Sequence, residues 1–256
     1  MASPSFQPKP YDSLSVIMPF RDEQATLRHA LSRLLAVEFS IPLEVVLVDD
    51  GSQDRSVDTI EDLLSLDHVL LLRNEEGRGK GNAVRSALND VSGDIVAVLD
   101  ADLEYDPADL VPLVNAVRSG QASVAYGCRP RSRDSFYSFW YMVGGRATSL
   151  WASLLFGSRV RDIHTSLKVA SRDLWHSLGL RCDGFDLDTE ITARSLRLGH
   201  RIVELPVGYS ARSKKEGKKL RWTAGVKSMW LLTRIRLEAA KPPAAQEAQP
   251  ETNVAV

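Results

Sequence analysis

Two aspartates, one residue apart, stand where an apolar run ends. Asp100 and Asp102 follow residues 94–99, which read as a buried strand. Alternate side chains of a strand share a face, so both carboxylates can point the same way at its carboxyl end, the edge at which open α/β sheets bind ligands. Two close carboxylates repel each other, which favours a hard cation such as Mg²⁺ or Mn²⁺ that could hold a diphosphate. Asp-x-Asp also occurs in solvated turns after core strands.

A second acidic motif follows another apolar run. Asp49 and Asp50 come directly after residues 43–48, and Gly51 permits a tight turn there. The Asp50 carboxylate could accept hydrogen bonds from a nucleotide base or from a ribose hydroxyl. Asp-Gly-Ser also forms Asx turns readily, and the two roles are compatible.

A glycine-rich basic segment, Gly-Arg-Gly-Lys-Gly, occupies residues 77–81. Its backbone N–H groups, Arg78 and Lys80 could contact phosphates at the start of a helix. It lacks Gly-Lys-Ser/Thr and Gly-x-Gly-x-x-Gly, so it is neither a Walker loop nor a dinucleotide-binding fingerprint. The alternative is a solvated loop.

Three further charged residues could join such a site. Glu104 lies two residues after Asp102 and could be a third metal ligand, a surface acid or a helix-entry charge. The Arg129 guanidinium, at the end of Tyr-Gly-Cys-Arg, could bind phosphate through two parallel hydrogen bonds. Asp188 lies where a helix is expected to begin, so it is either an active-site carboxylate or a favourable charge at the helix start.

A run of cations lies near the end of the chain. Residues 212–219 include Arg212, Lys218 and Lys219. Dense cations suit a pyrophosphate leaving group and a phosphate acceptor, although a solvated basic loop would look the same. The following segment, 222–236, mixes apolar and basic residues. It could lie on an anionic membrane, or it could pack as a terminal helix with a solvated basic face.

The elements that must position these residues alternate along the first half of the chain. Strands are expected at 13–20, 43–48, 69–72, 94–99 and 123–126. Helices are expected at 23–37, at 81–91, after Asp106-Pro107, and after a possible Ser56 cap. This order predicts an α/β fold with a mostly parallel, doubly wound sheet flanked by helices. After Cys128 the pattern breaks, with further strands expected at 160–169 and 202–207 and a terminal helix at 222–238.

Composition restricts the class of protein. The chain has 256 residues and a net charge of −1, which gives no indication of nucleic-acid binding. Cys128 and Cys182 fit neither a disulfide framework nor a zinc site, so a reducing compartment is expected. The first residues lack the apolar core of a signal peptide, and no apolar run is long enough to span a bilayer. We therefore expect a cytoplasmic protein, either free or held peripherally at a membrane.

Taken together, the motifs resemble those of one enzyme family. Pro-Phe-Arg-Asp-Glu at 19–23, the Asp49 and glycine-rich segments, and Asp-Ala-Asp-Leu-Glu at 100–104 resemble the family-two glycosyltransferases of the GT-A (Rossmann-like) fold. Residues 126–129 and 162–168 resemble further motifs of this family. Within the family the chain looks like the polyprenyl- (dolichyl-) phosphate glucosyl- and mannosyltransferase branch, and residues 212–219 are similar to an element of dolichyl-phosphate-glucosyltransferase-like proteins. Cys128 and Ser166 depart from the family's usual small polar residue and glycine. The resemblance covers roughly residues 15–236.

The resemblance implies a domain organisation and an activity. It implies a single GT-A domain at 14–240, with a nucleotide-sugar half at 14–129 and an acceptor half at 130–240 that ends in an amphipathic helix. A flexible tail at 1–13 and a disordered tail at 241–256 would flank it. The implied reaction is metal-dependent, inverting transfer of a hexose from a UDP- or GDP-sugar to a polyprenyl phosphate, with Mg²⁺ or Mn²⁺ as cofactor. A peripheral membrane contact or a membrane-protein partner would bring the lipid.

Two alternatives remain open: a glycosyltransferase for a soluble hydroxyl acceptor, with Asp188 as general base, and a catalytically inactive nucleotide-sugar-binding protein.

The resemblance also implies a role for each site residue. Catalytic roles fall to Asp188, Arg129 and Arg212, and metal binding to Asp102, Asp100 and Glu104. Donor binding falls to Pro19, Phe20, Glu23, Asp50, Lys80, Asp100, Ala101, Asp102, Lys218 and Lys219.

Overall fold

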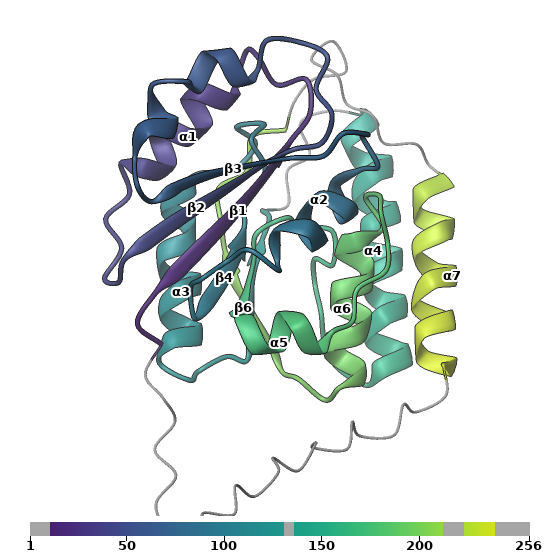
Figure 1. Ribbon diagram of the computed structural model, residues 1–256. Coiled ribbons are helices and arrows are strands. Elements are labelled where there is room, and N and C mark those ends of the chain that lie inside the picture. Colours follow the sequence, from purple (N-terminus) through teal and green to yellow (C-terminus); the bar gives the residue numbers. More distant parts are fainter. Residues whose placement is uncertain (1–10, 131–135, 212–222, 239–256) are drawn as a thin grey trace, which may run out of the picture.

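The fold is a mixed sheet with helices on both faces (Figure 1). The computed structural model describes residues 11–130, 136–211 and 223–238, and for 136–143 and 223–224 it describes the backbone only. Within these residues the sheet has seven strands in the order β3-β2-β1-β4-β6-β5-β7. The strands are β1 (Leu14–Phe20), β2 (Leu43–Asp49), β3 (Val69–Arg73), β4 (Ile95–Val98), β5 (Val124–Cys128), β6 (Lys168–Ser171) and β7 (Ile202–Pro206).

The sheet is parallel except at β6. This strand pairs antiparallel with both β4 and β5, whereas β1, β2, β3 and β4 run parallel, and β7 runs parallel to β5. The prediction of a mostly parallel α/β sheet is therefore confirmed. Because β6 lies between β4 and β5, the later part of the chain enters the middle of the sheet rather than forming a separate one.

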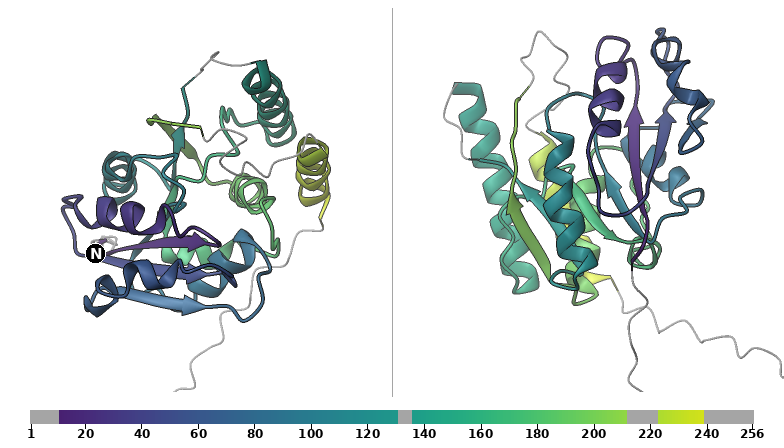
Figure 2. Two further views of the ribbon diagram at one scale, coloured as in Figure 1. Left: turned by 90° about the horizontal axis from the view of Figure 1, so that it is seen from above. Right: turned by 90° about the vertical axis from the view of Figure 1, so that its left-hand side faces the viewer.

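Helices form one layer on each face of the sheet (Figure 2). One core contains alternate β1 residues such as Val16 and Met18 together with α1 (Leu27–Leu35) and α3 (Leu110–Arg118). The other core contains Ile17 and the opposite face of β4. Its helices are α2 (Lys80–Ala87), α4 (Phe136–Phe156), α5 (Arg172–Ser177), α6 (Leu187–Arg197) and α7 (Thr223–Leu237). The two-residue alternation of the strands separates these cores.

One expected helix is replaced by short 3₁₀ turns. The residues after Ser56 form η1 (Val57–Ile60) and η2 (Leu63–Ser65), and Ser56 makes no side-chain cap. Its hydroxyl oxygen instead accepts a hydrogen bond from the Glu23 backbone N–H at 2.9 Å. This hydrogen bond joins the residues around Ser56 to the residues that follow β1. The expected Asp106 cap is present: its carboxylate accepts from the Ala108 N–H at 3.0 Å, before η3 (Pro107–Asp109) and α3.

The strand expected at 160–169 is much shorter, because β6 begins only at Lys168. Side chains hold the backbone of the preceding residues. The Arg161 and Asp162 N–H groups donate to the Glu204 carboxylate, and the Ile163 N–H donates to Ser149 Oγ. Since these donors are already satisfied, the segment forms a loop at the edge of the sheet.

Candidate functional site

The two aspartates of the Asp-x-Asp motif lie at the carboxyl edge of the sheet. Asp100 follows β4 after one residue, and its side chain is 24% exposed. The backbone turns sharply at Leu103, which has a φ of 63°, and an Asp102 carboxylate oxygen accepts the Glu104 N–H at 3.1 Å. Lys80, the first residue of α2, donates to the Asp100 carboxylate at 2.9 Å. The glycine-rich segment and the acidic motif therefore meet at this edge.

A buried chain of charges extends from this point into the protein. Lys80 Nζ also lies 3.4 Å from the Asp188 carboxylate, whose other oxygen is 3.0 Å from Lys168 Nζ. Lys168 is fully buried; it donates to the Ile163 carbonyl at 3.1 Å and to the Thr165 carbonyl, and lies over the Tyr126 ring. Asp188, in the first turn of α6, is thus held between two lysines. Lys168 was not predicted as a site residue. The sequence places this lysine directly before the apolar residues Val169 and Ala170, and a lysine in such a buried strand is rare enough to indicate a special role.

The lysines and aspartates of this cluster shift one another's pKa values. Burial alone would raise the pKa of the Asp188 carboxyl, but Lys168 and Lys80 lower it below its usual range. Burial opposes the charge of Lys80, yet Asp100 and Asp188 raise the pKa of that ammonium group. For Lys168, burial prevails over Asp188 and lowers the pKa. Asp188 therefore stays ionised and is a weak proton acceptor.

The glycine-rich segment is held by Asp50. The buried Asp50 carboxylate accepts the Gly79 N–H at 2.6 Å, the Arg78 N–H at 3.2 Å and the Asn74 side-chain amide at 3.2 Å. Two of the loop amides considered for phosphate binding therefore donate within the protein instead. The role of Asp50 in binding a base or ribose remains a prediction.

Close packing explains the glycines in this segment. Gly79 has a φ of +112°, and a Cβ there would lie 2.6 Å from the Asp183 carbonyl oxygen. A Cβ on Gly81 would overlap the Cys182 carbonyl. The loop before α6 therefore rests directly on the backbone at the start of α2, which brings Lys80 close to Asp188.

A second cluster joins Arg129 to the acidic motif. Two Arg129 nitrogens bind both Asp162 oxygens, at 2.7 and 2.8 Å. The guanidinium also lies 5.0 Å from the centre of the Tyr209 ring, and the Tyr209 hydroxyl donates to Glu104 at 2.8 Å. Burial alone would raise the pKa of Asp162, but the hydrogen bonds and charge of Arg129 lower it. Tyr209 was not predicted, because a single aromatic residue after a strand carries no distinctive pattern.

The remaining predicted residues divide into three groups. Pro19 and Phe20 are buried at the end of β1, and Glu23, just beyond, accepts from the Thr26 hydroxyl at 2.5 Å. Ala101 is buried between the two aspartates. Arg212, Lys218 and Lys219 lie outside the described residues.

The donor set at Asp100 and Asp102 fits a divalent cation in part. Mg²⁺ is usually bound by one or two carboxylates together with substrate phosphates, and both aspartates lie at an accessible sheet edge. Within residues 11–130, 136–211 and 223–238, no three His, Cys, Asp or Glu side chains converge on one metal position. Glu104 instead holds the Tyr209 hydroxyl, so its role as a third ligand remains a prediction.

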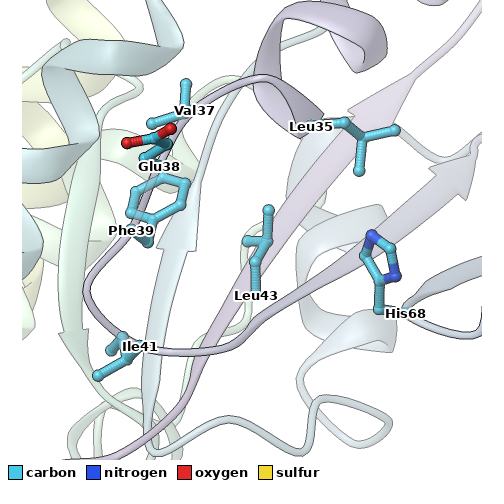
Figure 3. Close-up of a pocket in the computed structure, with 7 residues that line it drawn as sticks. All are labelled: Leu35, Val37, Glu38, Phe39, Ile41, Leu43 and His68. Carbon is cyan, nitrogen blue, oxygen red and sulfur yellow. The ribbon is translucent and has the colours of Figure 1, made fainter.

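A pocket lies at the amino ends of the strands, opposite the end that carries Asp100 (Figure 3). It includes Leu43, the first residue of β2, and His68, which precedes β3. Its other lining residues are Leu35, Val37, Glu38, Phe39 and Ile41. These mark the amino ends of the strands, so the pocket is separate from the charged cluster.

Comparison with known proteins gives a consistent family assignment. Residues 15–174, more than half of the chain, match glycosyl transferase family 2. The low-salt glycan biosynthesis hexosyltransferase Agl6 of Haloferax volcanii is 29% identical over 78% of this chain and 48% of its own length. The dolichol-phosphate mannosyltransferase of Pyrococcus furiosus is 26% identical over 80% of this chain and 58% of its own. An undecaprenyl-phosphate 4-deoxy-4-formamido-L-arabinose transferase of Aeromonas hydrophila is 30% identical over 80% and 62%.

The chain thus spans about half to three-fifths of the length of these relatives. Among solved structures, glucosyl-3-phosphoglycerate synthase from Mycobacterium tuberculosis, in complex with Mn²⁺, UDP and glucosyl-3-phosphoglycerate, superposes with a TM-score of 0.65. It is 21% identical over 88% of this chain and 80% of the other. This likeness shows the GT-A fold. Sequence and fold together place the chain in glycosyl transferase family 2.

Proposed function

We propose that this protein is a metal-dependent inverting glycosyltransferase that moves a hexose from a UDP- or GDP-sugar to a polyprenyl phosphate. Family membership supports the reaction type. The relatives named for dolichol phosphate and undecaprenyl phosphate support a lipid phosphate as acceptor. A peripheral membrane contact or a membrane-protein partner would give access to that lipid. No helix among the described residues is long and apolar enough to cross a bilayer.

The observation that carries the choice of acceptor is the setting of Asp188. A hydroxyl acceptor needs a base to take its proton, and an efficient base has a pKa near the working pH. Asp188 lies between Lys80 and Lys168, which hold the pKa of its carboxyl below the usual range. A phosphate acceptor is already anionic and needs no such base. Asp188 would then position the two lysines rather than remove a proton.

The residues at the sheet edge have complementary roles in this proposal. Asp102, with Asp100, would hold Mg²⁺ or Mn²⁺, which supplies positive charge to the departing nucleoside diphosphate. Lys80, 2.9 Å from Asp100, brings a permanent cation to the same place. Arg129, fixed by Asp162, would face phosphate, and Arg212, Lys218 and Lys219 would add charge. Pro19, Phe20, Glu23, Asp50 and Ala101 would line the donor site.

Matched acceptors test the proposal directly. The full-length protein is incubated with Mn²⁺ and radiolabelled UDP-glucose or GDP-mannose. The acceptor is either a polyprenyl phosphate or the polyprenol of the same chain length, in the same detergent. We expect label in the organic phase only with the phosphate, and loss of the transfer with a metal chelator. Transfer to the alcohol, or to a soluble hydroxyl compound alone, would contradict the proposed acceptor.

The Asp102→Asn variant tests the metal assignment with little change in shape. We expect it to lose transfer and metal-dependent nucleotide binding. Wild-type turnover by this variant would refute the role of Asp102. Bound nucleotide without transfer or donor hydrolysis in the wild-type protein would instead indicate a binding protein that lacks catalysis.

A further inference from the structure

Large apolar side chains gather on the outer side of two helices. Leu150 and Leu154 of α4 are 61% and 68% exposed, and Val226, Trp230 and Leu237 of α7 are 61%, 62% and 78% exposed. The two helices lie side by side at one end of the molecule, outside α6 (Figures 1 and 2). We call these five side chains the α4–α7 face.

The contacts between the helices place the exposed apolar residues of α4 and those of α7, one stripe on each helix, on the same side. Trp151 Nε1 donates to Thr233 Oγ1 at 3.0 Å, and one turn further on Arg236 Nε donates to the Leu155 carbonyl at 2.9 Å. Both numberings rise together, so the helices are parallel. At about 100° per residue, Leu150 and Leu154 flank this seam on α4, and the exposed α7 residues flank it on the same side. The stripes therefore form one continuous surface.

The core side of α7 is already filled by other residues. Leu231, Leu232 and Ile235 are buried in the core shared with α4 and α6. The exposed side chains are thus additional to those that hold the helix in place. Their exposure is not needed for folding, which indicates that they serve an interaction.

The exposed charges on the two helices themselves all have one sign. Arg146, Lys227, Arg234 and Arg236 are exposed on the same two helices, and neither helix contains Asp or Glu. Arg234 lies 5.4 Å from the centre of the Trp230 ring. Apolar side chains and tryptophan among cations suit an anionic lipid surface. A second copy of the chain would bring like charges together, which disfavours a dimer through this face.

We propose that the α4–α7 face docks on an anionic bilayer. The face deepens the proposed function by naming the surface that presents the lipid acceptor, and so rests on that function for its purpose. Helix α4 begins soon after β5 ends at Cys128, at the same sheet edge as Asp100. Leu150 and Leu154 lie in the last two turns of α4, so the docked bilayer would lie along the two helices, and the sheet edge with Asp100 would lie toward the end at which α4 begins. The apolar side chains would enter the interface, and the cations would contact lipid headgroups.

Vesicle flotation measures the docking without any need for activity. The full-length protein is mixed with vesicles of phosphatidylcholine alone or with about one-third phosphatidylglycerol. We expect flotation with the anionic vesicles, at least ten-fold weaker binding to the neutral ones, and release by high salt. Equal binding to both vesicle types, or no binding to either, would overturn the proposal.

Variants locate the surface. The double variant L154S/W230S should lower anionic-vesicle binding at least ten-fold. The control L70S/L198S, which alters leucines that are 40% and 52% exposed on other elements, should bind like the wild type. Both should keep a melting temperature near that of the wild type, since all four side chains are at least 40% exposed. Equal loss in both variants, or no loss in L154S/W230S, would contradict the proposal.

Activity and oligomeric state separate the remaining outcomes. L154S/W230S should transfer sugar normally to a short, water-soluble isoprenyl phosphate, but at least ten-fold more slowly to polyprenyl phosphate in vesicles. If the wild type floats but transfers no sugar to either acceptor, the proposed function fails while the docking surface stands. A wild-type dimer by light scattering that L154S/W230S converts to monomer would show that the face binds a second copy instead.

Discussion

The Glu104 carboxylate has two possible roles at the edge of the sheet. It lies close enough in sequence to Asp102 to serve as a metal ligand, and in the fold it accepts the Tyr209 hydroxyl at 2.8 Å. The Ser210 N–H also donates to the Glu104 carbonyl at 2.8 Å. These contacts attach the segment after β7, which leads toward the basic run, to the acidic motif. Glu104 is therefore placed to fix the position of that segment.

Two substitutions distinguish an anchor from a ligand. Glu104→Gln keeps an oxygen that can accept from Tyr209, whereas Tyr209→Phe removes the hydrogen bond, which is worth about 1 kcal/mol. We expect Glu104→Gln to keep the affinity for Mn²⁺ in the presence of UDP within about three-fold. Tyr209→Phe should raise the KM for the donor. A loss of Mn²⁺ affinity of ten-fold or more in Glu104→Gln, measured by titration calorimetry, would identify Glu104 as a metal ligand.

At the scale of elements, the start of α2 is fixed by contacts from two other parts of the chain. Asp50, after β2, accepts the loop amides, and the Asp183 carbonyl accepts the Asn82 N–H at 3.1 Å. These contacts orient the first residue of α2, Lys80, toward Asp100 and Asp188. The acidic edge therefore depends on how closely two backbones approach each other.

The approach of these backbones predicts the effect of one added methyl group. Gly79→Ala places a Cβ 2.6 Å from the Asp183 oxygen at a φ of +112°, so the loop must move and Lys80 with it. We expect a loss of about 1–3 kcal/mol in unfolding free energy and a higher donor KM. The control Gly225→Ala, in α7, meets no atom within 4 Å and should be neutral or slightly stabilising. Urea unfolding and donor titration of both variants would check this, and equal effects would contradict it.

At the scale of the whole molecule, the buried charges couple stability to pH. His164 lies beside the charged core, with its Nε2 2.8 Å from Thr148 Oγ1 of α4. Burial lowers the pKa of its imidazole to about 4. Its charged neighbours are Asp188 and Asp162, which favour the cation, and Lys168 and Arg129, which oppose it. The folded protein therefore holds His164 neutral.

The sign of this coupling follows from proton binding. The unfolded chain, in which the pKa of histidine is about 6.5, binds more protons than the folded protein as the pH falls toward 4. The free energy of unfolding should then decrease through this range, by at most about 3 kcal/mol from this group. His164→Gln, which can still hydrogen-bond Thr148, should show a smaller decrease. Urea unfolding at pH 7.5, 6 and 5 measures the slopes, and identical slopes in both proteins would rule out His164 as the cause.

The sequence by itself determined the class of fold and the edge at which the charged motifs meet. Short apolar runs identify β1, β2 and β4, and residues that directly follow parallel strands must lie at their shared carboxyl edge. Asp100 and Asp50 could be placed there because each is positioned by its own strand, only one or two residues away. Local periodicity and short spacing are sufficient for such predictions.

Only the tertiary structure decided which charges pair. Lys80 and Asp188 are 108 residues apart, and Tyr209 and Glu104 are 105 apart. Their contacts depend on how the loop before α6 and the segment after β7 pack, which no local pattern encodes. For the same reason, no local pattern shows that β6 pairs antiparallel between β4 and β5, or that Ser56 accepts a hydrogen bond from the Glu23 N–H. A periodic pattern shows which face of an element is buried, but which residues pack against that face depends on segments distant in the chain.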